Sequence, residues 1–230
     1  MYYTYEDIAG LIDHSLLQPN LCDAELDEGC RVAARYRVAS VCIKPYYVAR
    51  AAELLDGSGV AVGTTIGFPH GGHGTAVKRF ESDQALTDGA RELDMVVNVG
   101  HVLAGKWDAV TNEIRTIAEL SHSRDGIVKV IFENCFLKDE HKIRLCAACA
   151  EAGADYVKTS TGYGSGGATM DDLRLMRQHT PPHIGVKAAG GVRDFDTLLA
   201  VRAIGVTRVG ASKTIEMLEE CKKRLQLAVR

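Results

Sequence analysis

The sequence predicts an α/β protein of the (β/α)8 (TIM) barrel class, formed as a single domain over residues 1–230. Apolar runs alternate about eight times with amphipathic helical segments, and the connections have ordinary lengths. The runs are nearly continuous in Val and Ile, which is typical of parallel strands buried on both faces. Polar residues gather where the runs end, as they do at the carboxyl ends of barrel strands. An open doubly wound sheet is the alternative, but it usually has fewer strands and a recognisable nucleotide-binding first turn.

The first half of the chain supplies four of the expected strands. Residues 8–12 form the first apolar run, and a helix is expected over residues 23–37. Residues 38–43 form the second run, which Pro45 ends, and the same proline opens a helix over residues 46–55. Residues 60–66 are apolar and β-branched, and a glycine-rich loop at 67–74 leads to a helix over 75–87. Residues 92–99 give the fourth strand.

The second half continues the alternation to the end of the chain. Helices are expected over residues 107–120, 138–151, 171–179, 195–204 and 212–225. Strands are expected between them, over residues 127–132, 156–158, 185–188 and 208–210.

Composition excludes several classes of protein. The net charge of −3 argues against an electrostatic nucleic-acid binder. No apolar run approaches the length of a membrane span, and the first residues lack the basic and apolar regions of a signal peptide, so we expect a cytoplasmic protein. The cysteines number seven, which suggests reduced thiols. Cys146 and Cys149 form a C-x-x-C inside an alanine-rich helical pattern, which favours core packing over metal or redox chemistry.

Lys158 is the first candidate for a reactive group. It ends a short apolar run and opens a polar, glycine-rich loop, so its amine is expected in a partly dry pocket where desolvation lowers its pKa. A solvated surface lysine is the alternative. Lys187 lies on the next strand, and a second ammonium there would leave more of the first amine uncharged. The alternative for Lys187 is a partner for a phosphate or carboxylate.

Strand alternation indicates which other polar residues face the barrel interior. Residues 92, 94, 96 and 98 share one face, so Asp94 and Asn98 are expected to point inward, and Asp94 is the first candidate carboxylate. Glycines at 190, 191 and 210, together with Ser212, lie where barrel enzymes commonly bind phosphate. Residues 162–167 satisfy G-x-G-x-x-G, but the next helix starts only at about residue 171, so a dinucleotide site is not predicted.

Eight segments in order carry motifs of a known family: Ile12–Leu17, Val41–Pro45, Gly67–Gly71, Glu92–Asn98, Lys129–Glu133, Ala154–Gly162, Val186–Arg193 and Arg208–Ser212. Together they resemble the deoxyribose-phosphate aldolases, which are class I aldolases. The motifs span nearly the whole chain, and eight in family order are far more specific than any one alone.

The resemblance implies a barrel enzyme without metal or cofactor that reversibly cleaves 2-deoxy-D-ribose 5-phosphate into D-glyceraldehyde 3-phosphate and acetaldehyde. It assigns Lys158 as the Schiff-base lysine, Lys187 as the second lysine and Asp94 as the aspartate of proton transfer. It also implies a sugar-phosphate partner and a homodimer. The phosphate-binding positions it implies are Gly162, Gly190, Gly191, Gly210 and Ser212, and the pocket-lining positions are Asp13, Cys42 and Thr161.

Some residues depart from the family pattern, and three alternative functions remain open. Lys44, Asn134, Tyr163 and Lys213 stand where asparagine, threonine, phenylalanine and a small hydroxyl residue are common. The alternatives are a class I aldolase for another sugar phosphate, a sugar-phosphate binder without activity, and a metal-dependent aldolase. The last would use His70 and His73, for which no third ligand is apparent.

Overall fold

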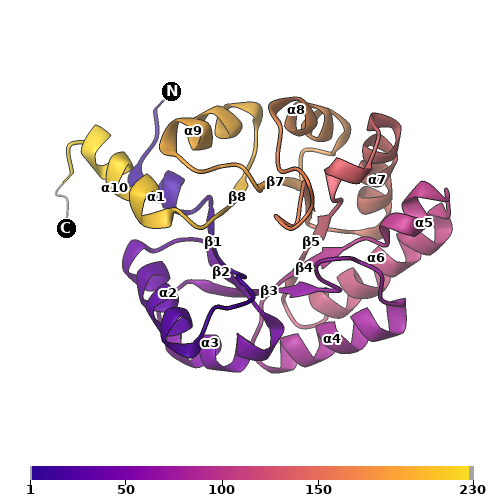
Figure 1. The fold of residues 1–230 in the computed structure, drawn as a ribbon, viewed down its shortest axis with the longest axis horizontal. Coiled ribbons are helices and arrows are strands. Elements are labelled where there is room, and N and C mark those ends of the chain that lie inside the picture. The colour runs from indigo at the N-terminus through magenta and orange to yellow at the C-terminus, as the bar shows by residue number, and fades with distance from the viewer. Residues whose placement is uncertain (1, 228–230) are drawn as a thin grey trace.

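A closed barrel of parallel strands forms the centre of the computed structural model, which describes residues 2–227 (Figure 1). Each strand pairs with the next along the chain, and β8 pairs with β1, so the sheet has no free edge. The predicted (β/α)8 class is confirmed. The strands are β1 (Ile12–Leu16), β2 (Ser40–Ile43), β3 (Ala61–Ile66), β4 (Glu92–Val96), β5 (Ile127–Ile131), β6 (Tyr156–Lys158), β7 (Gly185–Ala189) and β8 (Arg208–Ala211).

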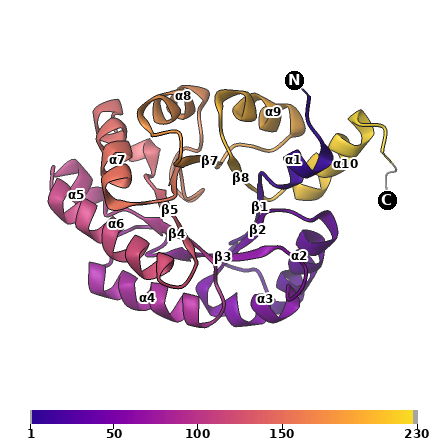
Figure 2. The same ribbon diagram turned by 180° about the vertical axis from the view of Figure 1, so that it is seen from behind.

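The helices form a ring outside the barrel, as the two opposite views show (Figures 1 and 2). Most of the expected helices agree with the structure to within three residues, and α4 and α9 coincide with their expected ranges. The helices are α1 (Tyr5–Ala9), α2 (Asp23–Tyr36), α3 (Val48–Leu54), α4 (Thr75–Thr87), α5 (Val99–Leu103), α6 (Trp107–His122), α7 (Asp139–Ala152), α8 (Met170–His179), α9 (Phe195–Ile204) and α10 (Thr214–Arg224), with short 3-10 turns η1 (Pro45–Tyr47) and η2 (Asn134–Phe136).

Alternation along the strands separates an apolar outer layer from a charged interior. Side chains such as Leu93 and Val157 are fully buried in the hydrophobic core. The intervening positions point into the barrel, where the register pairs Asp94 with Lys129 and Lys158 with Lys187. Buried charges of this kind are tolerated only when they are paired. The barrel interior is therefore organised around ion pairs.

The expected first strand over residues 8–12 is wrong, because its first two residues end α1, the next two form a turn, and only Ile12 belongs to β1. Thr4 and Asp7 form a reciprocal capping box that starts the helix, and Ile8 is fully buried on its inner face. The strand begins only at Ile12. A short apolar run does not by itself distinguish a buried helical turn from a strand.

The expected strand over residues 92–99 is too long. It ends at Val96, and the next residues turn into α5. The side chain of Asn98 caps this helix by accepting a hydrogen bond from the backbone N–H of His101 at 3.1 Å. The expectation that Asn98 points into the barrel is therefore wrong, while Asp94, inside the strand, does point inward.

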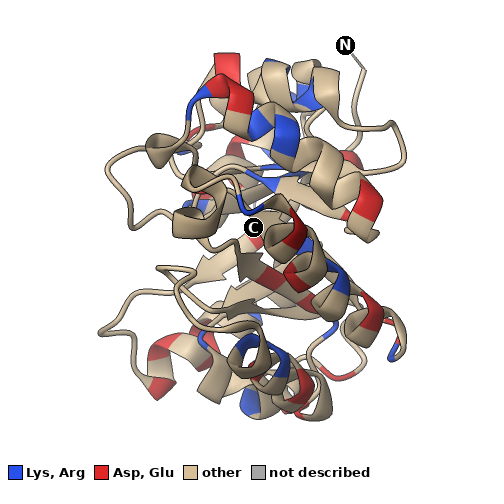
Figure 3. Cartoon of the chain, turned by 90° about the vertical axis from the view of Figure 1, so that its right-hand side faces the viewer, with Lys and Arg blue, Asp and Glu red and all other residues tan. Residues whose placement is uncertain are grey.

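The remaining surface and core features agree with the composition. Cys146 and Cys149 are buried free thiols in α7, which confirms their packing role. On the face shown in Figure 3, acidic and basic residues are interspersed along the helices. Among residues 2–227, none of the helices is both long and apolar enough to cross a bilayer.

Candidate active site

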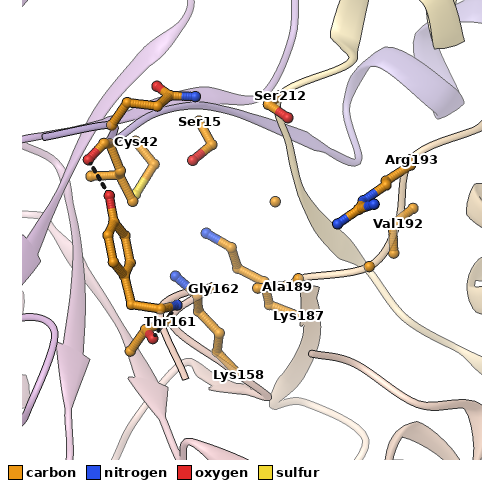
Figure 4. A pocket seen from close by; sticks show the side chains of 16 residues that line it. Ser15, Cys42, Lys158, Thr161, Gly162, Lys187, Ala189, Val192, Arg193 and Ser212 are labelled. Carbon is orange, nitrogen blue, oxygen red and sulfur yellow. Dashed lines mark hydrogen bonds between the residues drawn. The ribbon is translucent and has the colours of Figure 1, made fainter. Parts of the chain in front are cut away.

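A cavity of about 270 Å³ opens at the carboxyl ends of the strands. Lys158 and Lys187 enter it from neighbouring strands, and both side chains point into the same space (Figure 4). Of the predicted site residues, all line this cavity except Asp13 and Asp94, which are fully buried and contact the lysines. The other predicted residues on its wall are Cys42, Thr161, Gly162, Gly190, Gly191, Gly210 and Ser212.

Asp94 joins the two lysines. Its Oδ2 accepts hydrogen bonds from the Nζ atoms of Lys158 and Lys187, each at 2.6 Å. The thiol of Cys42 lies 3.9 Å from the same oxygen. A single carboxylate oxygen therefore bridges two amines on adjacent strands. This arrangement lets a proton pass between the three groups without a large movement.

A charged network continues below this trio, and sequence reasoning did not identify it as a unit. Lys129 Nζ lies 2.9 Å from Asp94 Oδ1 and 2.5 Å from Glu92 Oε2. Arg208 binds Glu92 at 2.7 Å and also pairs with Asp13, which in turn lies 2.5 Å from Lys187 Nζ.

The network sets three carboxylates against four basic side chains, so full ionisation would leave one excess positive charge in a nearly dry interior. Loss of one proton from one of the lysines removes that excess.

Electrostatics indicate which lysine gives up its proton. Burial lowers the pKa of Lys158, the nearby ammonium of Lys187 lowers it further, and Asp94 offsets only part of this effect. Burial also opposes the charge on Lys187, but Asp13 and Asp94 outweigh it and raise the pKa of that lysine. Burial would raise the pKa of Asp94, yet the lysines, Lys129 first, hold it well below its usual range. Of the three lysines in the network, Lys158 is therefore the one whose pKa is lowered, while the pKa values of Lys187 and Lys129 are raised.

The opposite wall of the cavity has the features of an anion site. Gly190 and Gly191 follow β7 with φ values of +74° and +101°, and a Cβ on Gly190 would lie 3.0 Å from the Cα of Gly167. Both glycines line the cavity, so their backbone can approach a bound anion as in phosphate-binding loops. Ser212 lies just before α10, and Arg193 adds a basic side chain that the prediction did not include (Figure 4).

The loop that follows β6 forms one wall of the cavity and is held by hydrogen bonds. Thr161 donates its hydroxyl to the buried Glu133, whose Oε1 also accepts from the Thr161 backbone N–H at 3.3 Å. The backbone N–H of Tyr163 donates to the Thr161 hydroxyl oxygen at 2.9 Å. Thr161 thus lies on the cavity wall, but its hydroxyl is already engaged. Its role in this conformation is to fix the loop.

Of the four residues that depart from the family pattern, three do not line the cavity. Lys44 donates to the carbonyls of Pro19 and Leu21, and Lys213 pairs with Glu216 at 3.0 Å. Asn134 lies in η2, where its amide contacts the sulfur of Met176. Tyr163 is the exception, because its side chain lines the cavity.

Neither His70 nor His73 of the glycine-rich loop lines the cavity that holds the two lysines. His70 faces a separate, adjoining cavity. In the part of the chain that the structure describes, no three His, Cys, Asp or Glu side chains are arranged to hold a metal ion.

A closed parallel barrel with a buried lysine of lowered pKa at its carboxyl-end cavity fits the class of Schiff-base, or class I, aldolases. The family model that matches residues 8–212 is that of the DeoC/LacD family aldolases, and the chain belongs to this family. It is 61% identical to the deoxyribose-phosphate aldolase of Rhodopirellula baltica, over 97% of this chain and 92% of that protein.

Solved structures agree with this assignment. The aldolase QR15 superimposes with a TM-score of 0.90 at 35% identity, covering 96% of this chain and 98% of that one. The deoxyribose phosphate aldolase of Aeropyrum pernix gives a TM-score of 0.89 at 32% identity, covering 96% and 93%.

Proposed function

We propose that the protein cleaves 2-deoxy-D-ribose 5-phosphate reversibly into D-glyceraldehyde 3-phosphate and acetaldehyde, with Lys158 as the Schiff-base nucleophile. The observation that carries the proposal is the shared oxygen of Asp94, which lies 2.6 Å from both lysine amines. The identity to the Rhodopirellula baltica enzyme supports the choice of substrate.

The reaction starts from the open-chain aldehyde of the substrate. The uncharged amine of Lys158 attacks C1, and loss of water from the carbinolamine gives an iminium ion. The C3 hydroxyl passes its proton to the Lys187–Asp94 pair, which has given one to the departing water, and the C2–C3 bond breaks as its electron pair moves toward the iminium nitrogen. Glyceraldehyde 3-phosphate leaves with a carbonyl at the former C3, and an enamine of acetaldehyde stays on Lys158. Protonation of its terminal carbon and hydrolysis by water release acetaldehyde and restore the amine.

Lys187 and Asp94 supply the protons. Lys187 has a raised pKa and remains an ammonium, so it acts as the acid that helps water leave the carbinolamine. Asp94 has a strongly lowered pKa, so on its own it is a weak base. The two groups share a hydrogen bond, and their proton transfer is therefore best described as that of a pair.

The glycine-rich wall provides the phosphate site in this proposal. Backbone N–H groups near Gly190, Gly191 and Gly210, with Ser212, bind the phosphate at the far side of the cavity from Lys158. Gly162 belongs to the same wall, and Cys42 and Thr161 line the space between. Asp13 contributes indirectly by holding Lys187.

Four experiments test the proposal. Deoxyribose 5-phosphate is expected to release acetaldehyde, whereas fructose 1,6-bisphosphate is not; the reverse preference would mean a different class I aldolase. Borohydride added with substrate is expected to give a stable covalent adduct, which a non-catalytic binder would not give. Lys158→Leu is expected to lose both adduct and cleavage with an unchanged circular dichroism spectrum, and a variant with full activity would refute the assignment. Chelator is expected to leave the rate unchanged.

We also propose a cytoplasmic enzyme that forms a homodimer. The support is the family resemblance. The Aeropyrum pernix relative is described as tetrameric, so sedimentation of this protein is the direct test of its oligomeric state.

A further inference from the structure

A second cavity of about 540 Å³ lies beside the catalytic one. Its wall comes from the β3–α4 loop, from α5, from η2 and from the β6–α8 loop. Leu103, Phe136 and Tyr163 all line it with side chains that are 52%, 55% and 46% exposed. Large apolar side chains gathered in this way at a concave surface are typical of a binding site.

Tyr163 lies on the wall that the two cavities share. Thr161 and Tyr163 line both of them, so the loop that carries these residues is the common wall. The Tyr163 hydroxyl donates to the carbonyl of Leu17, beyond β1, at 2.7 Å, and its ring meets Phe68 edge to face with centroids 5.4 Å apart. The ring is therefore held across the mouth of the barrel between the β6 and β1 sides.

Thr161 is the fixed part of this wall. Its hydroxyl and its backbone N–H both bind Glu133, which is 3% exposed. Each carboxylate oxygen of Glu133 thus accepts a hydrogen bond from Thr161, which holds Thr161 in place. The ring of Tyr163, in contrast, can be removed by substitution while the contacts between Thr161 and Glu133 are kept.

We propose that Tyr163 is a specificity-determining residue: its ring closes the catalytic cavity against the apolar one, so that the acceptor aldehyde is confined to a compact, phosphorylated molecule. Without the ring, the two spaces join, and an aldehyde with an alkyl or aryl substituent places that substituent against Leu103 and Phe136. This inference rests on the proposed function, because it uses the same Lys158 enamine.

The reaction concerned is the synthetic direction. The enamine of acetaldehyde on Lys158 attacks the carbonyl carbon of the acceptor, and a new C–C bond forms. The carbonyl oxygen takes a proton from the Lys187–Asp94 pair and becomes a hydroxyl. Water then hydrolyses the iminium ion and releases a 3-hydroxyaldehyde. No oxidant or further reactant is required.

The test compares Tyr163→Ala with Tyr163→Phe, using acetaldehyde as donor and 3-phenylpropanal as acceptor. Burial of a phenyl group favours binding enough to raise kcat/KM about 10- to 100-fold, and we expect that gain in Tyr163→Ala. Tyr163→Phe keeps the ring and loses only the bond to Leu17, so it is the matched control and should stay within about threefold of the parent. Adding Leu103→Trp to Tyr163→Ala fills the apolar cavity and should cancel the gain.

The possible outcomes separate this inference from the proposed function. If the parent protein gives no borohydride adduct with deoxyribose 5-phosphate, the proposed function fails. A second outcome is that the parent forms the adduct, but Tyr163→Ala, folded by circular dichroism, shows no gain in kcat/KM with 3-phenylpropanal. The proposed role of Tyr163 is then refuted. An equal gain in Tyr163→Phe also refutes it, because the hydroxyl tether would then be the cause. Should Tyr163→Ala not fold, Tyr163→Val removes the ring with less loss of packing and is read in the same way.

Discussion

Asp94 has two roles in the structure: it stabilises the buried ion pairs of the barrel, and it takes part in proton transfer. Asp94→Asn tests the two roles separately. The change keeps the size of the side chain and removes a negative charge that lies 2.6 Å from Lys158 and Lys187 and 2.9 Å from Lys129. Removing one partner from a buried ion pair costs about 3–5 kcal/mol of the free energy of unfolding. We expect a loss of that size in urea denaturation.

Catalysis by the variant is expected to slow at the proton-transfer steps, loss of water from the carbinolamine among them, while the Schiff base still forms. Positioned acid–base groups contribute about 10²- to 10⁴-fold, so kcat for cleavage of deoxyribose 5-phosphate should drop by that factor. Asp94 raises the pKa of Lys158, so its removal lowers that pKa further and leaves more free amine. Borohydride trapping should therefore persist. In a plot of trapping against pH, the fall on the acid side should move to lower pH.

Glu113→Gln is the matched control. Glu113 on α6 forms a similar buried pair with Lys78 at 2.8 Å, and neither residue lines the catalytic cavity. The control is expected to lose about 3–5 kcal/mol of stability as well, while kcat stays within about threefold of the parent at temperatures where both proteins are folded. If Asp94→Asn keeps near-parental kcat, or if Glu113→Gln loses as much, the assigned role of Asp94 is wrong.

Three further variants test other parts of the site and the barrel. Lys187→Met removes the neighbouring ammonium that lowers the pKa of Lys158, so the acid limb of kcat/KM is expected to move to higher pH; an unchanged limb would contradict this electrostatic coupling. Gly190→Ala forces a side chain into a backbone with φ of +74°, 3.0 Å from Gly167 Cα, and should cost about 1–2 kcal/mol of stability and raise KM for the phosphorylated substrate about tenfold. His14 is buried against Thr214 at 2.7 Å, and burial lowers its pKa from 6.5 to about 4. The parent should therefore lose up to about 3 kcal/mol of stability as pH falls from 6.5 to 4, and urea titrations of His14→Gln should lack most of this loss.

The barrel was predictable from the sequence because its determinants are local. The period of two along each strand identified the inward face, and this placed Asp94 correctly beside the lysines. The same rule failed for Asn98, since the rule holds only inside a strand and gives no information on where the strand ends. The capping box of Thr4 and Asp7 was a usable signal for α1, but the apolar run that follows it was assigned to a strand.

The parts that sequence reasoning missed depend on contacts between distant segments. Arg208 pairs with Glu92 and Asp13, which lie more than a hundred residues away along the chain. The hydroxyl of Tyr163 reaches Leu17 across the mouth of the barrel, and the second cavity forms where α5, η2 and the loops after β3 and β6 meet. Local patterns contain no record of such partners, so they become visible only once the sheet has closed.

The most direct test of the central claim is to locate the covalent adduct. The protein is incubated with acetaldehyde, reduced with borohydride, digested, and examined by tandem mass spectrometry. We expect one added ethyl group on the peptide that contains Lys158, with the modification on that lysine and none on Lys187. An adduct on Lys187 instead, or no adduct in a protein that still cleaves deoxyribose 5-phosphate, would contradict the account.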